Sequence, residues 1–166
     1  MPDEDIGALY LGNHRCRFRV WAPKADKVEV HLVFPAERTE SLKPSGRGYW
    51  SAVLDQVAAG ARYYYLLDRK IQRPDPASHY QPEGVHKFSE VINHSMYAWS
   101  DEGWEGIPLE KLILYELHVG TFTREGTFRA VIPRLDQLKK LGINTISLMP
   151  VAQFPGNRNW GYDGVY

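Results

Sequence analysis

The chain has 166 residues, of which 43% are hydrophobic and 24% are charged, a composition typical of a folded globular protein. Its 20 basic residues balance its 20 acidic ones, and no basic stripe stands out, so nucleic acid is not an expected partner. No apolar run approaches the ~20 residues of a membrane span, and the acidic residues 1–6 lack an apolar signal region. Because the only cysteine, Cys16, cannot form an internal disulfide, a reducing cytoplasm is the expected compartment.

Residues 1–95 have the pattern of β-structure. Hydrophobic residues alternate with polar ones over short runs, as where Phe18 and Val20 lie on one side of a strand and arginines on the other. Pro, Gly and Asp bound these runs, as is typical of strands joined by turns. The expected strands are residues 16–22, 27–33, 48–54 and 60–68. Short strands at close spacing, with no helical period between them, predict an antiparallel sandwich.

The strand pattern ends near Arg73, and loop residues such as proline, glycine and aspartate follow. Residues 96–107 are expected to form an ordered connector. Trp99 and Trp104 lie in this part of the chain among polar residues, and we expect their rings to pack between two bodies. A flexible linker would be richer in glycine and serine and poorer in tryptophan.

Residues 108–166 follow a different pattern, that of a β-α-β unit. Residues 111–119 are nearly all apolar, which predicts a strand buried on both faces. Thr127 is a candidate helix cap, Pro133 is expected to start or bend the helix, and Gly142 is placed to end it. Residues 143–150 form the next apolar strand, which should run parallel to the first. One helix and two parallel strands cannot bury both faces of a sheet, so we expect this second domain to be incomplete.

Several segments resemble the α-amylase family of glycoside hydrolases. Residues 115–123 (YELHVGTFT) and 141–151 (LGINTISLMPV) are similar to the first two strands of that family's catalytic barrel. Residues 154–156 (FPG) and 159–166 (NWGYDGVY) are most similar to its trehalohydrolases, as are residues 75–78 (DPAS) and 81–86 (QPEGVH). Residues 18–23 (FRVWAP), 48–50 (GYW) and 63–65 (YYY) resemble the immunoglobulin-like domain that precedes such barrels.

The resemblance implies a mainly β protein with an α/β part. An immunoglobulin-like β-sandwich of the isoamylase N-terminal type, residues 1–95, would precede the start of a truncated (β/α)₈ barrel at residues 108–166. It also implies a retaining α-glucan hydrolase that needs no cofactor and acts on maltooligosaccharides or maltooligosyl-trehalose, most closely by releasing trehalose. A branching or debranching enzyme, or a sandwich that only binds glucan, are the alternatives.

Retaining glycosidases need two carboxyl groups about 5–5.5 Å apart at the scissile bond. In the resembling family the catalytic carboxylates follow the fourth, fifth and seventh barrel strands, which would lie beyond Tyr166. No residue of this chain is therefore expected to be catalytic, and the 166 residues alone are expected to be inactive.

The same resemblance places a substrate-stacking tyrosine at Tyr162, in the loop after the second strand. An aromatic face suits the apolar face of glucose, although a tyrosine that packs its own loop would look the same in sequence. Trp160 and Asp163 flank it and are candidates for sugar contact, with loop packing and a backbone hydrogen bond as their respective alternatives.

Two further pairs of residues are candidates for the site. Glu116 and His118 alternate along the first barrel strand, so they share a face and could form a buried polar floor of the site, or could satisfy neighbouring polar groups. With no third ligand nearby, a metal site is not expected. Trp21 and Trp50 could stack on glucan, but because both lie in alternating strands, core packing is the favoured interpretation.

Overall fold

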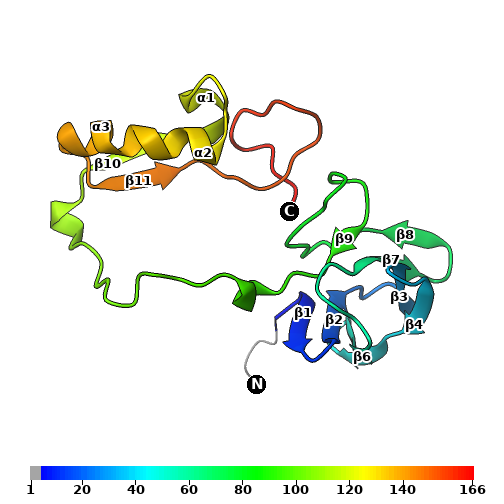
Figure 1. Cartoon of the computed structure of the whole chain (residues 1–166). Helices are drawn as coiled ribbons and strands as arrows, with labels where there is room; N and C mark the ends of the chain where they lie inside the picture. The colour runs from blue at the N-terminus through cyan, green and yellow to red at the C-terminus, as the bar shows by residue number, and fades with distance from the viewer. Residues whose placement is uncertain (1–4) are drawn as a thin grey trace. The chain divides into compact units, whose positions relative to one another are not determined.

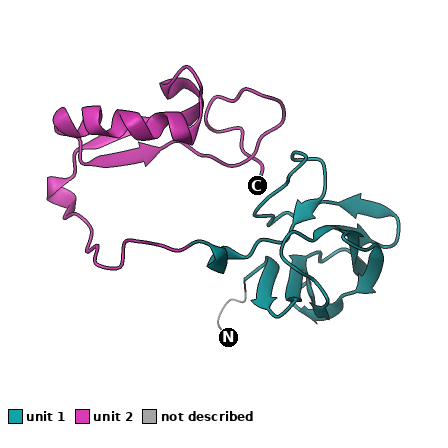
Figure 2. Cartoon of the chain, in the orientation of Figure 1, with its two compact units in different colours: residues 1–97, 166 teal, residues 98–165 magenta. Residues whose placement is uncertain are grey.

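The computed structural model describes residues 5–166, and it divides into two compact units (Figure 1). One comprises the residues up to 97 together with 166, and the other comprises residues 98–165 (Figure 2). Residues 1–4, part of the acidic N-terminal segment, lie outside the described part. Within residues 5–166 no helix is both long and apolar enough to cross a bilayer.

The N-terminal unit contains two antiparallel sheets. One has the strand order β1-β2-β6-β5, and the other has the order β4-β3-β7-β8, with β9 also paired to β7. The strands of the first sheet are β1 (Gly7–Gly12), β2 (Arg15–Trp21), β5 (Lys43–Gly46) and β6 (Tyr49–Asp55). Those of the second are β3 (Val28–Phe34), β4 (Arg38–Ser41), β7 (Arg62–Leu67), β8 (Ile71–Arg73) and β9 (Ser89–Glu90). The four strands predicted from alternation correspond to β2, β3, β6 and β7.

Side chains from both sheets meet in one hydrophobic core, which makes this unit a sandwich. Phe18 on β2 contacts Tyr63 on β7 edge to face, with ring centroids 4.9 Å apart. Val20 on β2 and Val30 on β3 are buried in the same cluster. As the alternation predicts, the arginines of β2 lie on the opposite face of their strand from Phe18 and Val20.

The segment after β8, predicted as loop, is buried against the sandwich and carries polar groups into it. The Asp75 carboxylate is fully buried and accepts a hydrogen bond from the Tyr63 hydroxyl at 2.6 Å and one from the Ala77 N–H at 2.8 Å. The Asp75 N–H donates to the Ser89 hydroxyl at 3.1 Å. Buried polar groups in irregular chain are stable when they are paired in this way, so this loop is part of the sandwich.

The second unit holds a parallel strand pair and a broken helix. β10 (Leu114–Leu117) and β11 (Thr145–Leu148) pair in parallel, as predicted, with Leu114 opposite Thr145. Between them lie α1 (Val119–Phe122), α2 (Phe128–Val131), the 3₁₀ turn η3 (Ile132–Arg134) and α3 (Leu135–Lys140). Two other 3₁₀ turns are η1 (His94–Met96) and η2 (Leu109–Lys111).

The helix boundaries follow their predicted signals. The Thr127 side chain caps α2 by accepting from the Ala130 N–H, and Pro133 lies in the 3₁₀ turn that interrupts the helix. Gly142 has φ +98°, and the Ile143 N–H donates to the Leu138 carbonyl at 3.1 Å. This pattern is a Schellman motif, which satisfies the last carbonyls of a helix.

One burial prediction for the second half of the chain is wrong. Ile113 and Leu114 are 53% and 57% exposed, because β10 has only β11 beside it and one helical layer within residues 98–165. The expected strand 111–119 is also shorter, since Lys111 belongs to η2 and Val119 to α1. Trp99 and Trp104 are both 72% exposed, in a segment without regular secondary structure, and packing of their rings between two bodies stays a prediction.

Candidate functional site

The loop that follows β11 displays two aromatic rings around a buried glycine. Gly161 is buried and has φ +98°, a conformation that favours glycine. A Cβ at this position would clash with the Met149 side chain and lie 3.2 Å from Cδ2 of His118. Trp160 and Tyr162, on either side, are 89% and 71% exposed. The backbone at Gly161 therefore faces inward, and the neighbouring rings face solvent.

Side-chain hydrogen bonds hold this loop in place. The Asn159 Oδ1 atom accepts from the Gly161 N–H at 2.6 Å and lies 3.0 Å from Nε2 of His118, which follows β10. The Asp163 carboxylate accepts from the Trp160 N–H at 2.8 Å. Asp163 thus makes the backbone hydrogen bond that was its alternative role. These contacts bring His118 together with the segment of Trp160, Tyr162 and Asp163, at the carboxyl ends of two parallel strands.

Glu116 and His118, which were predicted to share a buried face, differ in burial. Glu116 is exposed, where we expected a buried carboxylate, because the face of β10 that it shares with Leu114 is uncovered in this unit. His118 is half-buried, and its Nδ1 atom is buried without a hydrogen-bond partner among the described residues. Over residues 5–166, no cluster of three or more His, Cys, Asp or Glu side chains could hold a metal ion.

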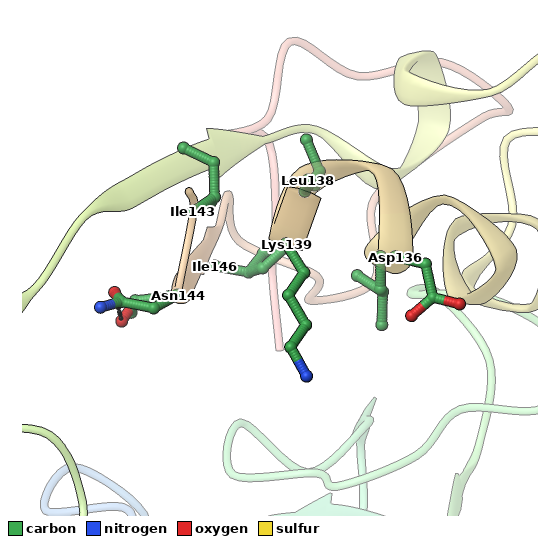
Figure 3. Close-up of a pocket in the computed structure, with 8 residues that line it drawn as sticks. Asp136, Leu138, Lys139, Ile143, Asn144 and Ile146 are labelled. Atoms are coloured by element: carbon green, nitrogen blue, oxygen red, sulfur yellow. Dashed lines mark hydrogen bonds between the residues drawn. The ribbon is translucent and has the colours of Figure 1, made fainter. Parts of the chain in front are cut away.

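A hollow of about 330 Å³ lies between α3 and β11 and contains none of the predicted site residues. Leu138, Ile143 and Ile146 give it an apolar lining, and Asp136 and Lys139 contribute its charged groups (Figure 3). Apolar walls with one carboxylate and one ammonium do not form a constellation for glycosidic chemistry, which needs two carboxyl groups across a bond.

The two tryptophans of the sandwich occupy different environments. Trp50 on β6 packs against the core, and its indole N–H donates to the Ala22 carbonyl at 3.1 Å, as the core-packing interpretation predicts. Trp21 is 58% exposed, so core packing is wrong for this residue. Its indole N–H donates to the Arg47 carbonyl at 3.2 Å.

Trp21 has neighbours that the sequence analysis missed. It pairs across the strands with Tyr49, and the Arg19 guanidinium lies 4.5 Å from the centroid of the Tyr49 ring. Residues at directly paired positions of antiparallel strands lie on the same face. Alternation along β2 gives the signal for this face, because Arg19 and Trp21 are two residues apart. Asn159 was also missed, and no local pattern marks a residue that contacts His118 from 41 positions away.

Comparison with known proteins identifies a domain type and several relatives of this chain. Residues 5–80 match the model of carbohydrate-binding module 48, the isoamylase N-terminal domain. A malto-oligosyltrehalose trehalohydrolase from Saccharolobus solfataricus is 48% identical over 153 residues, which cover 90% of this chain and 26% of that protein. The enzyme of that name from Deinococcus radiodurans is 42% identical over 165 residues, 98% of this chain and 26% of the relative. The chain thus spans about a quarter of the length of these relatives.

A branching enzyme and a solved structure add to this comparison. A 1,4-alpha-glucan branching enzyme from Clostridium perfringens is 26% identical over 183 residues, 96% of this chain and 28% of that protein. A crystal structure from Salmonella typhimurium, described provisionally as an alpha amylase, matches with a TM-score of 0.88 and 41% identity over 98% of this chain and 27% of its own. Over most of its length, the chain is therefore a homologue of malto-oligosyltrehalose trehalohydrolases, of which it spans about a quarter, and residues 5–80 match the carbohydrate-binding module 48 domain.

Proposed function

We propose that this chain is the N-terminal part of a retaining α-glucan hydrolase that cleaves the α-1,4 bond next to the trehalose end of maltooligosyl-trehalose. The observation that carries the proposal is the difference in similarity between two enzyme classes. Relatives named as trehalohydrolases are 41–48% identical, whereas the branching enzyme is 26% identical over a similar stretch. We propose the cytoplasm as its compartment, since its cysteine is a buried free thiol.

In this proposal β10, the helical segment and β11 begin a (β/α)₈ barrel, whose active sites lie at the carboxyl ends of the strands. Tyr162 would stack on the apolar face of a glucose ring. Trp160 would extend the aromatic surface, and Asp163 would hold the turn between them through its hydrogen bond to the Trp160 N–H. Glu116 and His118 would lie toward the floor of the same pocket. The nucleophile and the acid would come from later strands.

The test compares two lengths of the protein on maltooligosyl-trehalose. The product of the full reading frame should release trehalose, and the 166-residue chain should release none. Trehalose from the short chain would refute the argument that its carboxylates are insufficient. A full-length product that shifts the iodine spectrum of amylose toward branched glucan, without releasing trehalose, would identify a branching enzyme instead.

A second candidate function, glucan binding by the sandwich itself, is favoured by the exposure of Trp21. An indole that is 58% exposed beside Tyr49 and the Arg19 guanidinium offers a flat apolar surface with hydrogen-bond donors nearby. This combination suits a sugar ring, which has an apolar face and a polar rim. Trp50 is half-buried and donates its N–H internally, so it would support the face from within the core.

Titration with maltoheptaose, followed by NMR on the 166-residue chain, tests this second function. Trp21→Ala should abolish a saturable response, and Trp104→Ala, which removes another exposed indole from the connector, should leave it unchanged. Equal loss in both variants would indicate non-specific stacking. A wild-type chain without any response at Trp21 would rule out this function.

A further inference from the structure

The contact between His118 and Asn159 defines which nitrogen of the imidazole carries the proton. Asn159 Oδ1 accepts from the Gly161 N–H at 2.6 Å, and a backbone N–H can only donate. The atom facing His118 Nε2, at 3.0 Å, is therefore an acceptor oxygen, so Nε2 must bear a hydrogen. A neutral imidazole has one such hydrogen. Nδ1 is then a bare lone pair, and it is the atom that is buried without a partner among the described residues.

This single oxygen joins two parts of the chain. The His118–Asn159 hydrogen bond connects the end of β10 to the loop after β11, and the Gly161–Asn159 hydrogen bond within the loop meets it at the same oxygen. Gly161 lies against the imidazole itself, since an added Cβ would be 3.2 Å from His118 Cδ2. The backbone of the loop is thus held at Asn159 and Gly161, immediately before Tyr162.

The rest of the loop is fixed independently of His118. The Asp163 carboxylate closes the turn by accepting from the Trp160 N–H at 2.8 Å, and the Val165 N–H donates to the Gln153 carbonyl at 2.7 Å. Loss of the His118 contact should therefore loosen Asn159 and Gly161 and leave the Val165 contact in place. This difference separates a positioning role from general disorder of the loop.

We propose that His118, as its Nε2–H tautomer, is a positioning residue that fixes the Asn159–Gly161 backbone and so presents the Tyr162 ring. That the ring then meets a sugar rests on the proposed function, whereas the tautomer and the fixed backbone do not. His118 acts only through Asn159 and Gly161, without touching the sugar. A ring 71% exposed on a mobile loop would lose conformational entropy on stacking, and a loop fixed in advance reduces that cost.

Two substitutions at His118 separate the role of Nε2 from the bulk of the ring. In His118→Gln the terminal amide nitrogen lies near the position of Nε2 and can donate to Asn159. In His118→Asn the amide lies near the position of Nδ1 and cannot reach. Loss of one neutral hydrogen bond, a net effect of about 1 kcal/mol, corresponds to roughly a fivefold change in an opening equilibrium. The Gly161 amide should therefore exchange with solvent about fivefold faster in His118→Asn and within twofold of wild type in His118→Gln.

The control for folding is the Val165 amide, whose exchange should change in neither variant, together with unchanged spectra for residues 5–97. Long-range ¹⁵N–¹H correlation spectra of the imidazole should show hydrogen on Nε2 in the wild-type chain. Hydrogen on Nδ1, or equal acceleration of Gly161 in the Gln and Asn variants, would overturn the proposal. Parallel acceleration at Val165 would reduce His118 to a general structural role and would overturn it as well.

A maltoheptaose titration of the same three proteins tests separately whether positioning by His118 assists sugar binding at Tyr162. Tyr162 resonances should shift in wild type and in His118→Gln, and about fivefold more sugar should be needed in His118→Asn. If wild-type Tyr162 does not respond, the stacking role in the proposed function is wrong, and the positioning role is judged on Gly161 exchange alone. If Tyr162 responds equally in all three, the proposed effect of His118 on sugar binding is refuted.

Discussion

The buried Asp75 carboxylate offers the sharpest test of how the sandwich is held together. It fastens the segment after β8 to the core by accepting from the Tyr63 hydroxyl at 2.6 Å and from the Ala77 N–H at 2.8 Å. Asp75→Ala removes both acceptors and leaves the Tyr63 hydroxyl, in a side chain only 1% exposed, without this partner. Asp75→Asn keeps an amide oxygen that can accept from Tyr63, and it removes the ionisable group.

The size of the destabilisation follows from the number of hydrogen-bond donors that lose their acceptor. Each buried donor left without a partner costs about 1–3 kcal/mol. Asp75→Ala should therefore lower the free energy of unfolding of the sandwich by about 2–5 kcal/mol. Asp75→Asn should cost about 1 kcal/mol at acidic pH, where the native carboxyl is protonated and the two side chains are most alike. Urea unfolding followed by near-ultraviolet circular dichroism of the core tyrosines measures both.

The pH dependence carries the stronger test. Burial raises the pKa of Asp75 above its ordinary 3.8, an effect that the hydrogen bonds from Tyr63 and Ala77 only partly oppose. The folded state therefore keeps this proton to higher pH than the unfolded chain does. Its contribution to stability is complete below the unfolded pKa and is lost as pH rises through the folded pKa. Because other groups titrate alike in both proteins, the free energy of unfolding of wild type should exceed that of Asp75→Asn by less and less from pH 3.5 upward. An advantage that stays constant or grows with pH would refute the reasoning.

Three other substitutions test the core and a helix end. Burial raises the pKa of the Cys16 thiol to about 12, so the native thiol should resist alkylation. Because the unfolded thiol ionises first, the free energy of unfolding measured in urea should fall from pH 9 to 11 by about 1.4 kcal/mol per pH unit more in wild type than in Cys16→Ala. Phe18→Ala should destabilise the sandwich by about 3–5 kcal/mol in the same assay, because Phe18 is fully buried against Tyr63. Gly142→Ala should cost about 1 kcal/mol, measured by amide exchange at Ile143, because φ is +98° there.

Local patterns predicted those elements whose stability depends on local features. Alternation located β2, β3, β6 and β7, because these strands have one face in the core. Thr127, Pro133 and Gly142 marked the ends and the interruption of the helix, since caps and breakers act through the nearest backbone groups. The missed strands β1, β4, β5, β8 and β9 lie at sheet edges or are short; all residues of β5, for example, are exposed. Such strands carry no alternating signal.

The interactions between distant segments were outside the reach of these patterns. Asp75 was assigned to a loop because prolines flank it, and Ser89 because the strand pattern ends near Arg73; only the tertiary fold shows them buried and paired. In the same way, resemblance placed Tyr162 and Asp163 in a candidate site, but nothing in the sequence pairs His118 with Asn159. The predicted burial of residues 111–119 failed for a related reason. Apolar composition shows what a strand can bury, and the neighbouring elements decide whether it does so.

Trp21 and Trp50 lie on opposite faces of the β1-β2-β6-β5 sheet, a difference that alternation along β2 already indicates. Strand alternation favoured core packing for both residues, yet Trp21 is two residues from Arg19 on β2 and must share its face. Cross-strand register then places Trp50, opposite the buried Val20, on the inner face, and Tyr49, opposite Trp21, on the outer one. The Trp21 indole donates its N–H to the Arg47 carbonyl, yet more than half of the side chain remains in water, where apolar area is costly. That cost is the physical reason to test the outer face of the β1-β2-β6-β5 sheet for glucan binding first.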